Sequence, residues 1–255
     1  LYIYGTINAT GTVQDSIYFT AYTDDSIGGG TNGDGNTTAP YAGYWEGIRL
    51  ANADNISILS HCRLRYAGNY YSGYYNTIYL YNYSEMEIDN SIIEYNGDST
   101  QSYLNSAILV QDHCSLTISN SMIKNSNHNG ICVSSNAELQ ITDTGIIDNI
   151  YQGICLADCT TIEFTFDNLE ISGNGDWGLS INPENLNSLN ANLIYENNGY
   201  GNAIKLYSGN IIEDTVMKDF TYLLNDITVN DQLTLTLEPG TVMKFNQGTR
   251  FTVNG

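Results

Sequence analysis

One short apolar segment recurs seven times along this chain of 255 residues. Its leading aliphatic residues are separated by 30, 30, 23, 23, 25 and 25 positions. A repeat of this length is typical of solenoids, because one unit cannot bury its apolar face alone whereas stacked units can. The copies are Gly47-Ile48-Arg49-Leu50, Thr77-Ile78-Tyr79-Leu80, Ala107-Ile108-Leu109-Val110, Gly130-Ile131-Cys132-Val133, Gly153-Ile154-Cys155-Leu156, Gly178-Leu179-Ser180-Ile181 and Ala203-Ile204-Lys205-Leu206.

Two further strand patterns follow several of these copies in constant order. The second places apolar residues at Met86/Ile88, Leu116/Ile118, Leu139/Ile141 and Ile162/Phe164. The third reads Ser91-x-Ile93-x-x-Asn96, Ser121-x-Ile123-x-x-Ser126, Thr144-x-Ile146-x-x-Asn149, Leu169-x-Ile171-x-x-Asn174 and Asn192-x-Ile194-x-x-Asn197. Coils stacked about 4.8 Å apart would pair every strand in parallel with its copies above and below. The pattern therefore predicts an all-β fold, a single parallel β-helix solenoid over residues 1–255 with three strands per coil and coils of about 23–30 residues.

Alternation within each strand predicts which side chains leave the core. It directs Arg49, Tyr79, Cys132 and Lys205 outward. The Asn that ends the third strand suits a tight corner, because Asn tolerates left-handed backbone geometry and stacked Asn side chains can bond along the axis. An antiparallel sandwich with coincidental spacing would not keep three strand types in order through so many periods.

Several segments resemble a known group of proteins. They are Gly5 to Thr12, Ile17 to Thr20, Asp24 to Gly35, Gly43-Tyr44-Trp45-Glu46-Gly47-Ile48 and Leu237-Glu238-Pro239-Gly240-Thr241-Val242-Met243-Lys244-Phe245. In these segments the chain resembles the right-handed parallel β-helix, or pectate-lyase-like solenoid, proteins of prokaryotic cell surfaces. The resemblance implies a right-handed solenoid and an extracellular, cell-surface location. It says little about activity, since such modules serve adhesins, surface layers and carbohydrate-active proteins alike.

The two ends of the chain look like complementary pieces of the same repeat. In the resembling proteins, the Pro-Gly-Thr segment is usually followed by an apolar strand and then by a Gly-Thr-rich segment. Here Phe251 to Gly255 would run naturally into Leu1 to Gly5. Open strand edges associate readily. We therefore expect the module to continue into copies of itself, either covalently in a longer chain or head to tail in a filament.

Charge restricts the partners. Eight Lys plus Arg stand against 28 Asp plus Glu, which gives a formal charge of −20 and a pI near 4.1. Nucleic acid is excluded because phosphate binding needs a basic surface, and an anionic membrane or acidic polysaccharide would be repelled unless a divalent cation bridges the surfaces. The sequence contains no run of 18 apolar residues, so we predict no membrane insertion.

The five cysteines, at positions 62, 114, 132, 155 and 159, are an odd number without zinc-ligand spacing. We expect small buried or surface thiols. Cys132 and Cys155 would occupy equivalent outward positions in adjacent coils, so a disulfide between them is conceivable, although parallel side chains give it poor geometry.

Insertions lengthen three successive coils between the third strand and the next first strand, at about residues 21–44, 66–76 and 96–106. We expect them to stack into one raised surface. Aromatic rings with polar tips are good platforms for sugar or protein contacts. The aromatic residues expected on this surface are Tyr41, Tyr44, Trp45, Tyr70, Tyr71, Tyr74, Tyr75 and Tyr103.

The first insertion also suits calcium, the one cofactor that the sequence favours. Calcium accepts six to eight oxygen ligands in loose geometry, and Gly-spaced side chains on a flexible loop can supply them. The spacing is not that of an EF-hand, and an ordinary polar loop is the competing interpretation. The candidate ligands are Asp24, Asp25, Asn32, Asp34 and Asn36.

Three functions compete. A polysaccharide lyase or hydrolase would need basic residues beside acids, or two carboxylates held about 5 to 10 Å apart. Here the eight basic residues are scattered, and His61, His113 and His128 fall in different parts of their coils. We therefore favour an extracellular structural or adhesive protein over a carbohydrate-binding module or an enzyme, and predict no catalytic residues. The outward acids that could form such a pair are Glu85, Glu87, Glu94, Asp112 and Asp143.

Overall fold

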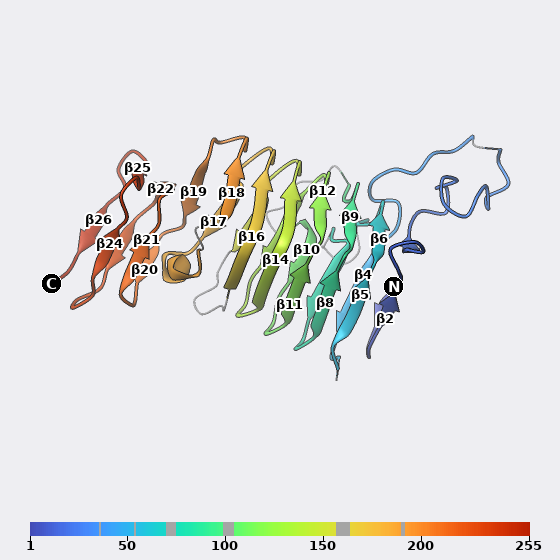
Figure 1. Cartoon of the computed structure of the whole chain (residues 1–255), viewed down its shortest axis with the longest axis horizontal. Coiled ribbons are helices and arrows are strands. Elements are labelled where there is room, and N and C mark those ends of the chain that lie inside the picture. The colour runs from blue at the N-terminus through green and yellow to red at the C-terminus, as the bar shows by residue number, and fades with distance from the viewer. Residues whose placement is uncertain (36, 54, 70–74, 99–104, 157–163, 190–191) are drawn as a thin grey trace.

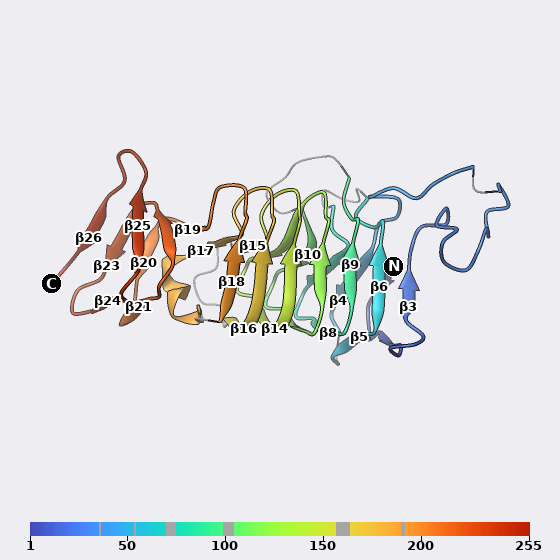
Figure 2. The same cartoon turned by 45° about the horizontal axis from the view of Figure 1, so that its top comes forward.

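A computed structural model describes the chain except residues 36, 54, 70–74, 99–104, 157–163 and 190–191. Short strands stack along one long axis, and the two termini lie at opposite ends of the stack (Figures 1 and 2). Neighbouring strands pair in parallel and in register, so that Ile78, Ile108, Ile131 and Ile154 follow one another along the axis. The predicted parallel solenoid is confirmed.

The first strands of the coils form one continuous ten-stranded sheet. Its strands, in spatial order, are β1 (Tyr2–Ile3), β4 (Ile48–Ala51), β7 (Ile78–Tyr81), β10 (Ser106–Val110), β13 (Asn129–Val133), β15 (Ile154–Leu156), β17 (Leu179–Ile181), β19 (Ala203–Leu206), β22 (Thr221–Leu224) and β25 (Val242–Phe245).

The second and third strands form the other two faces, which β14 and β16 join because each runs around the corner between them (Figure 2). The second face holds β2 (Asn8–Thr10), β5 (Ser57–Ser60), β8 (Glu85–Asp89), β11 (Ser115–Ser119) and the first parts of β14 (Glu138–Ile147) and β16 (Phe164–Ser172). The third face holds β3 (Ile17–Phe19), β6 (Cys62–Arg65), β9 (Ile92–Glu94), β12 (Met122–Lys124), the last parts of β14 and β16, and β18 (Leu193–Glu196).

The core is one apolar column along the axis. Alternate residues of all three faces fill it, and aliphatic side chains such as Leu80, Ile118 and Ile146 are fully buried. A single coil would leave its apolar side chains exposed at its upper and lower edges. Stacking buries them, because each coil lies directly on the next.

Hydroxyl groups connect the coils at the corner between the second and third strands. The Ser91 hydroxyl accepts the Cys62 N–H at 2.9 Å and donates to the Asp89 carbonyl, while the Ser91 N–H donates to the Ser121 hydroxyl at 3.0 Å. Thr144 accepts the Ser121 N–H in the same way. The residue just before each hydroxyl takes the left-handed conformation, as Asn90, Asn120 and Asp143 do with φ of 48°.

Asparagines connect the coils at the end of the third strand. The Asn149 and Asn174 N–H groups donate to the side-chain oxygens of Asn174 and Asn198, and their amide groups donate along the same row over 2.9 and 3.0 Å. The predicted Asn stack is therefore present. The left-handed residue is the preceding one, Asp148, Gly173 or Asn197, because the stacked Asn must keep its side chain inside the corner.

The predicted third strand near residue 194 is wrong by one position. Ile171 pairs with Tyr195, so Tyr195 faces the core while Ile194 is 55% exposed. An inward Tyr is tolerated because its hydroxyl accepts the Leu179 N–H at 2.9 Å and donates to the Ala203 carbonyl at 3.0 Å. Asn198, and not Asn197, continues the Asn row.

Residues on the outer side of the first sheet point away from the core column as predicted, but some of them are covered. Arg49 and Cys132 point away from the core column but are buried, and Leu109, Cys132 and Cys155 form a second small apolar cluster with Tyr79. The Arg49 guanidinium donates to the carbonyls of Ile48, Glu46 and Asn76, with 2.7 Å to the last. Side-chain alternation gives the direction of a residue but not what covers it.

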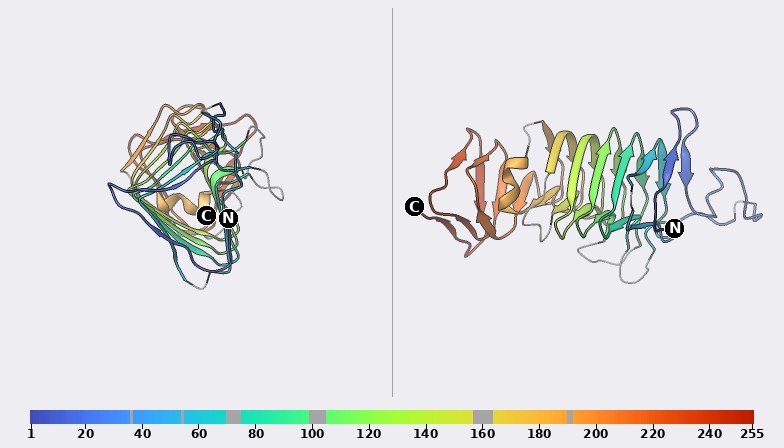
Figure 3. Two further views of the ribbon diagram at one scale, coloured as in Figure 1. Left: turned by 90° about the vertical axis from the view of Figure 1, so that its right-hand side faces the viewer. Right: turned by 90° about the horizontal axis from the view of Figure 1, so that it is seen from below.

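A 3-10 helix, η1 (Pro183–Ser188), interrupts the second and third faces. It lies inside the outline of the solenoid (Figure 3). Its residue Leu186 packs in the core. Beyond it lie β20 (Gly209–Ile211), β21 (Thr215–Met217), β23 (Ile227–Val229), β24 (Leu235–Leu237) and β26 (Phe251–Val253). Glu184 and Asn187 accept the N–H groups of Asn210 and Val216 in place of a neighbouring strand.

Candidate functional site

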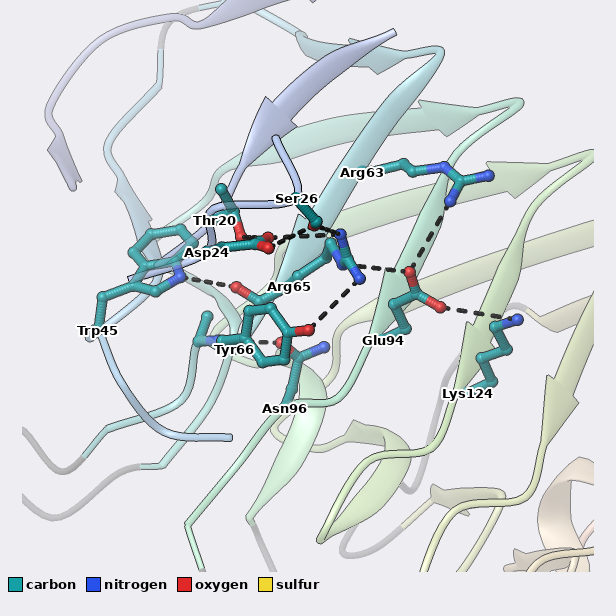
Figure 4. A network of polar contacts seen from close by, with 11 residues as sticks. Thr20, Asp24, Ser26, Trp45, Arg63, Arg65, Tyr66, Glu94, Asn96 and Lys124 are labelled. Carbon is teal, nitrogen blue, oxygen red and sulfur yellow. Dashed lines mark hydrogen bonds and ion pairs between the residues drawn. The ribbon is translucent and has the colours of Figure 1, made fainter. Parts of the chain in front are cut away.

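A buried carboxylate fixes the start of the first insertion to the third face of the solenoid. Asp24 is 4% exposed and accepts hydrogen bonds from the Thr20 and Ser26 hydroxyls at 2.5 Å (Figure 4). The Arg65 guanidinium lies 3.3 Å from the same carboxylate. Burial alone would raise the pKa of Asp24, but the two hydroxyls and the charge of Arg65 lower it below its ordinary value. Asp24 therefore acts as an anchor for the loop.

Glu94 lies at the centre of a charged cluster on the same face (Figure 4). The cluster is an in-register row across three coils, because Arg65 pairs with Glu94 and Glu94 with Lys124. Glu94 oxygens lie 3.4 Å from Arg65, 3.6 Å from Lys124 and 4.0 Å from Arg63. Three of the eight basic residues thus meet at one carboxylate, and the expectation that basic residues are scattered is wrong for these coils.

The predicted calcium ligands are largely occupied by protein groups. Asp34 accepts bonds from the Thr37 and Thr38 N–H groups and from the Thr38 hydroxyl, and Asn32 bonds to Asp34 and Thr38. Asp25 differs, because both its carboxylate oxygens are buried without a hydrogen-bond partner. Within the residues that the structure describes, no three His, Cys, Asp or Glu side chains gather as metal ligands. Asn36 lies outside those residues, and calcium binding stays a prediction.

Of the predicted aromatic surface, four residues can be placed. The Tyr41 ring meets the edge of Tyr44 at 5.3 Å and is 61% exposed. Trp45 packs against the body of the solenoid instead. Its indole N–H donates to the Arg65 carbonyl at 2.8 Å, and its ring packs on the core. Tyr75 lies 6.0 Å from the His128 ring. The other four, Tyr70, Tyr71, Tyr74 and Tyr103, lie outside the described residues.

The segments in which the three insertions are predicted begin after β3, β6 and β9. The first one extends past the N-terminal coil along the axis (Figures 1 and 2). It returns to the body where the Gly43 and Tyr44 N–H groups donate to the Ala67 and Tyr66 carbonyls. The prediction of one raised surface built from all three insertions depends on residues outside the described part.

A long groove follows the corner between the second and third faces. Its volume is about 600 Å³, and it spans the coils from His61 to Ile194. One rim carries the left-handed corner residues Asn90, Asn120, Asp143 and Asn168. The opposite wall carries the outward residues of the third strands, which are Arg63, Ile92, Met122, Gly145, Glu170 and Ile194. No sequence pattern singled out this groove, because its residues are 23 to 30 positions apart.

The histidines have separate roles. His61 bonds to Ser60 at the groove, and His113 stacks on Tyr83. His128 is a corner residue as expected, but it is only 1% exposed, and neither ring nitrogen has a hydrogen-bond partner. Burial lowers its pKa to about 4, although Asp98, 4.0 Å away, opposes the shift. Gly97 is required beside it, because any side chain there would collide with the imidazole.

The described cysteines, at positions 62, 114, 132 and 155, are buried and form no disulfide with one another. Cys132 and Cys155 lie side by side in register but are not joined. The described residues contain no helix of the length and apolarity that crossing a membrane requires.

Comparison with known proteins identifies a family. The family described as right handed beta helix region matches over residues 41–164 and again over residues 98–234, which together cover more than half of the chain. No curated protein and no solved structure matches it.

Proposed function

This chain belongs to the right-handed β-helix family, and we propose that it works outside the cell as a structural or adhesive surface protein. The observation that carries this proposal is the continuity of the solenoid. The first sheet pairs without a break from β1 to β25. Side-chain rows of Ser, Thr and Asn add a second set of bonds at two corners, so each coil is fixed to the next by more than its backbone.

Such bonding supports a stiff rod. A backbone N–H that is paired and buried exchanges its hydrogen with water slowly, and the apolar column resists separation of the coils. A rod of this kind can hold a binding surface at a fixed distance from its point of attachment. Stiffness of this type is useful to a scaffold or an adhesin.

The surface chemistry supports the same role. The acid excess keeps the rod soluble and prevents association with other polyanions. Exposed aromatic rings, Tyr22 at 60% and Tyr41 at 61%, lie on the first insertion, which extends past the first coil. Large rings with polar tips make contacts at low entropic cost. We propose that this insertion makes adhesive contacts.

Two buried carboxylates at the third face are engaged in structural contacts. Glu94 is neutralised by Arg65, Lys124 and Arg63, and Asp24 holds the first insertion. Buried thiols suit an extracellular location as well, since Cys62, Cys114 and Cys132 are shielded from oxidants.

Protease shaving of intact producing cells tests the location, and attachment of protein-coated beads to cells tests the adhesive role. We expect shaving to remove the protein from intact cells. We also expect the double variant Tyr22→Ser/Tyr41→Ser to reduce bead attachment, while Tyr83→Ser, an equally exposed Tyr on another corner, leaves it unchanged. Protein that resists shaving until the cells are lysed would contradict the proposal.

A further inference from the structure

We infer that the axial groove is a binding site for an extended, uncharged oligosaccharide that lies parallel to the solenoid axis. This inference goes beyond the structural role proposed above and does not depend on it. It rests on three properties of the groove. These are a rim of hydrogen-bond acceptors, an apolar wall, and a notch in that wall at Gly145, where the side chain is missing.

The rim offers a row of side-chain amide groups held in place by carboxylates. The Asn90 and Asn120 amide groups each donate one hydrogen to a carboxylate oxygen of Asp89, at 2.6 and 2.9 Å. The Asn168 amide group donates one hydrogen to Asp143 at 2.5 Å. Each of the three asparagines keeps its carbonyl oxygen as an acceptor and a second N–H as a donor. Sugar hydroxyl groups match such a rim because they can both donate and accept.

The acceptors are evenly spaced along the groove. Asn90, Asn120, Asp143 and Asn168 are the same corner residue of four successive coils, so they repeat at the strand spacing of about 4.8 Å. A pyranose ring in an extended chain is about as long as this spacing. One ring can therefore face each coil, and a linear oligosaccharide can repeat the same contact along the rim.

The opposite wall suits the non-polar face of a sugar ring. Ile92 and Met122 are partly exposed there, and Ile194 is 55% exposed. Arg63 begins this wall and Glu170 lies next to its last residue, so the stretch between them, which is Ile92, Met122 and Gly145, is uncharged. Because the whole chain carries −20, an acidic polysaccharide is repelled, whereas a neutral chain meets no such barrier.

Gly145 is the residue that points most directly to a ligand. It lies inside β14, between Met122 and Glu170 of the neighbouring coils, where every other position in the row has a side chain. The fold does not require glycine here, since its φ is not positive and an added Cβ would have only ordinary contacts, the nearest 3.7 Å away. Glycine weakens a strand, and in a strand interior it often marks a close approach by a ligand.

The test fills this notch. We would measure retardation of the protein in native gels that contain neutral polysaccharides, namely hydroxyethylcellulose, glucomannan, arabinoxylan and dextran. Wild type should be retarded by at least one of them. Gly145→Ile should abolish the retardation, and its melting temperature should equal or exceed that of wild type because Ile is a better strand former. Gln140→Ile, on the exposed side of the same strand and outside the groove, should bind as wild type does.

Two results would overturn the inference. The first is that wild type is retarded by none of the four polysaccharides. The second is that Gly145→Ile binds as tightly as Gln140→Ile, which places the contact outside the groove. Neither of these results bears on the cell-surface role, which the shaving experiment tests separately.

Discussion

The side-chain amide of Asn149 donates to the side-chain oxygen of Asn174 in the next coil over 2.9 Å, and the backbone N–H of Asn149 donates to the same oxygen at 3.2 Å. Both side chains are 1% exposed. One oxygen therefore satisfies two buried donors of the coil before it. This pair shows how the solenoid fixes the position of one coil on the next.

Asn174→Ala should be among the most destabilising single changes in the chain. It leaves the Asn149 N–H without an acceptor, and the Ile146 and Ser172 carbonyls lose their donor. Each buried polar group left unpaired costs about 1–3 kcal/mol, so we expect a loss of about 3 kcal/mol in the free energy of unfolding by urea titration. Asn202→Ala, at an exposed Asn, should stay within about 0.5 kcal/mol of wild type. Equal effects of the two variants would contradict the role of the Asn row.

Glu94→Gln should lower the free energy of unfolding by about 2 kcal/mol. Removing one partner of a fully buried ion pair would cost more, but here Arg63 and Lys124 are partly exposed to water. Lys124→Gln should cost less, since Glu94 keeps Arg65 at 3.4 Å. Urea titrations at low and high salt measure both effects. If Lys124→Gln proved the more harmful change, Glu94 would not be the centre of the cluster.

Acid should destabilise the corner that holds His128. Its pKa is lowered from 6.5 to about 4 in the folded protein, so the unfolded chain binds the proton first as the pH falls. The stabilising contribution of neutral His128 is complete above pH 6.5 and decreases toward pH 4. The charged and titratable groups placed beside it are Asp98 and Tyr75.

His128→Leu isolates this effect. Between about pH 7 and pH 4, wild type should lose about 3 kcal/mol of unfolding free energy relative to the variant, at about 1.4 kcal/mol per pKa unit. The comparison uses urea titrations of both proteins at several pH values, which cancels the other titrating groups. Parallel pH profiles of the two proteins would show that His128 does not titrate with a lowered pKa.

The buried thiols should be nearly inert in the folded protein. Burial raises the pKa of Cys62 and of Cys114 to about 11 and raises that of Cys132 as well. At about pH 8, the small thiolate fraction should slow alkylation by iodoacetamide by roughly a hundredfold relative to the unfolded chain. Peptide mapping after timed alkylation measures each thiol separately. Modification of Cys62 or Cys114 at the unfolded rate would contradict their burial.

The repeat made the solenoid predictable from sequence, because aliphatic residues such as Ile108, Ile131 and Ile154 must share one register to be buried. The same spacing predicted the Asn row at Asn149 and Asn174. It failed at Ile194, because apolar alternation alone cannot anticipate that Tyr195 faces inward with its hydroxyl paired. The left-handed residue, Asp148, lies one place before the predicted Asn149, because either residue type suits that geometry.

The site was less predictable than the fold. The ionic row of Arg65, Glu94 and Lys124 and the acceptor rim of the groove form only when strands 23 to 30 residues apart are placed in register. An error of one residue in a single coil would send each of these side chains to the other face. Sequence spacing predicts that register to within a residue or two. This precision is enough to predict the fold, but not to predict which side chains meet at a site.

Distances along one outward row test the solenoid most directly. Asn8, Ile58, Glu87, Thr117, Gln140 and Thr165 follow one another in register on the second face. Spin labels on introduced cysteines, in a chain with Cys159→Ser, can be measured in pairs by double electron–electron resonance. The separations should rise in equal steps, from about 14 Å for Ile58 and Gln140 to about 19 Å for Ile58 and Thr165 and about 24 Å for Asn8 and Thr165. Separations that do not increase with the number of coils between the labels would contradict the stacked solenoid.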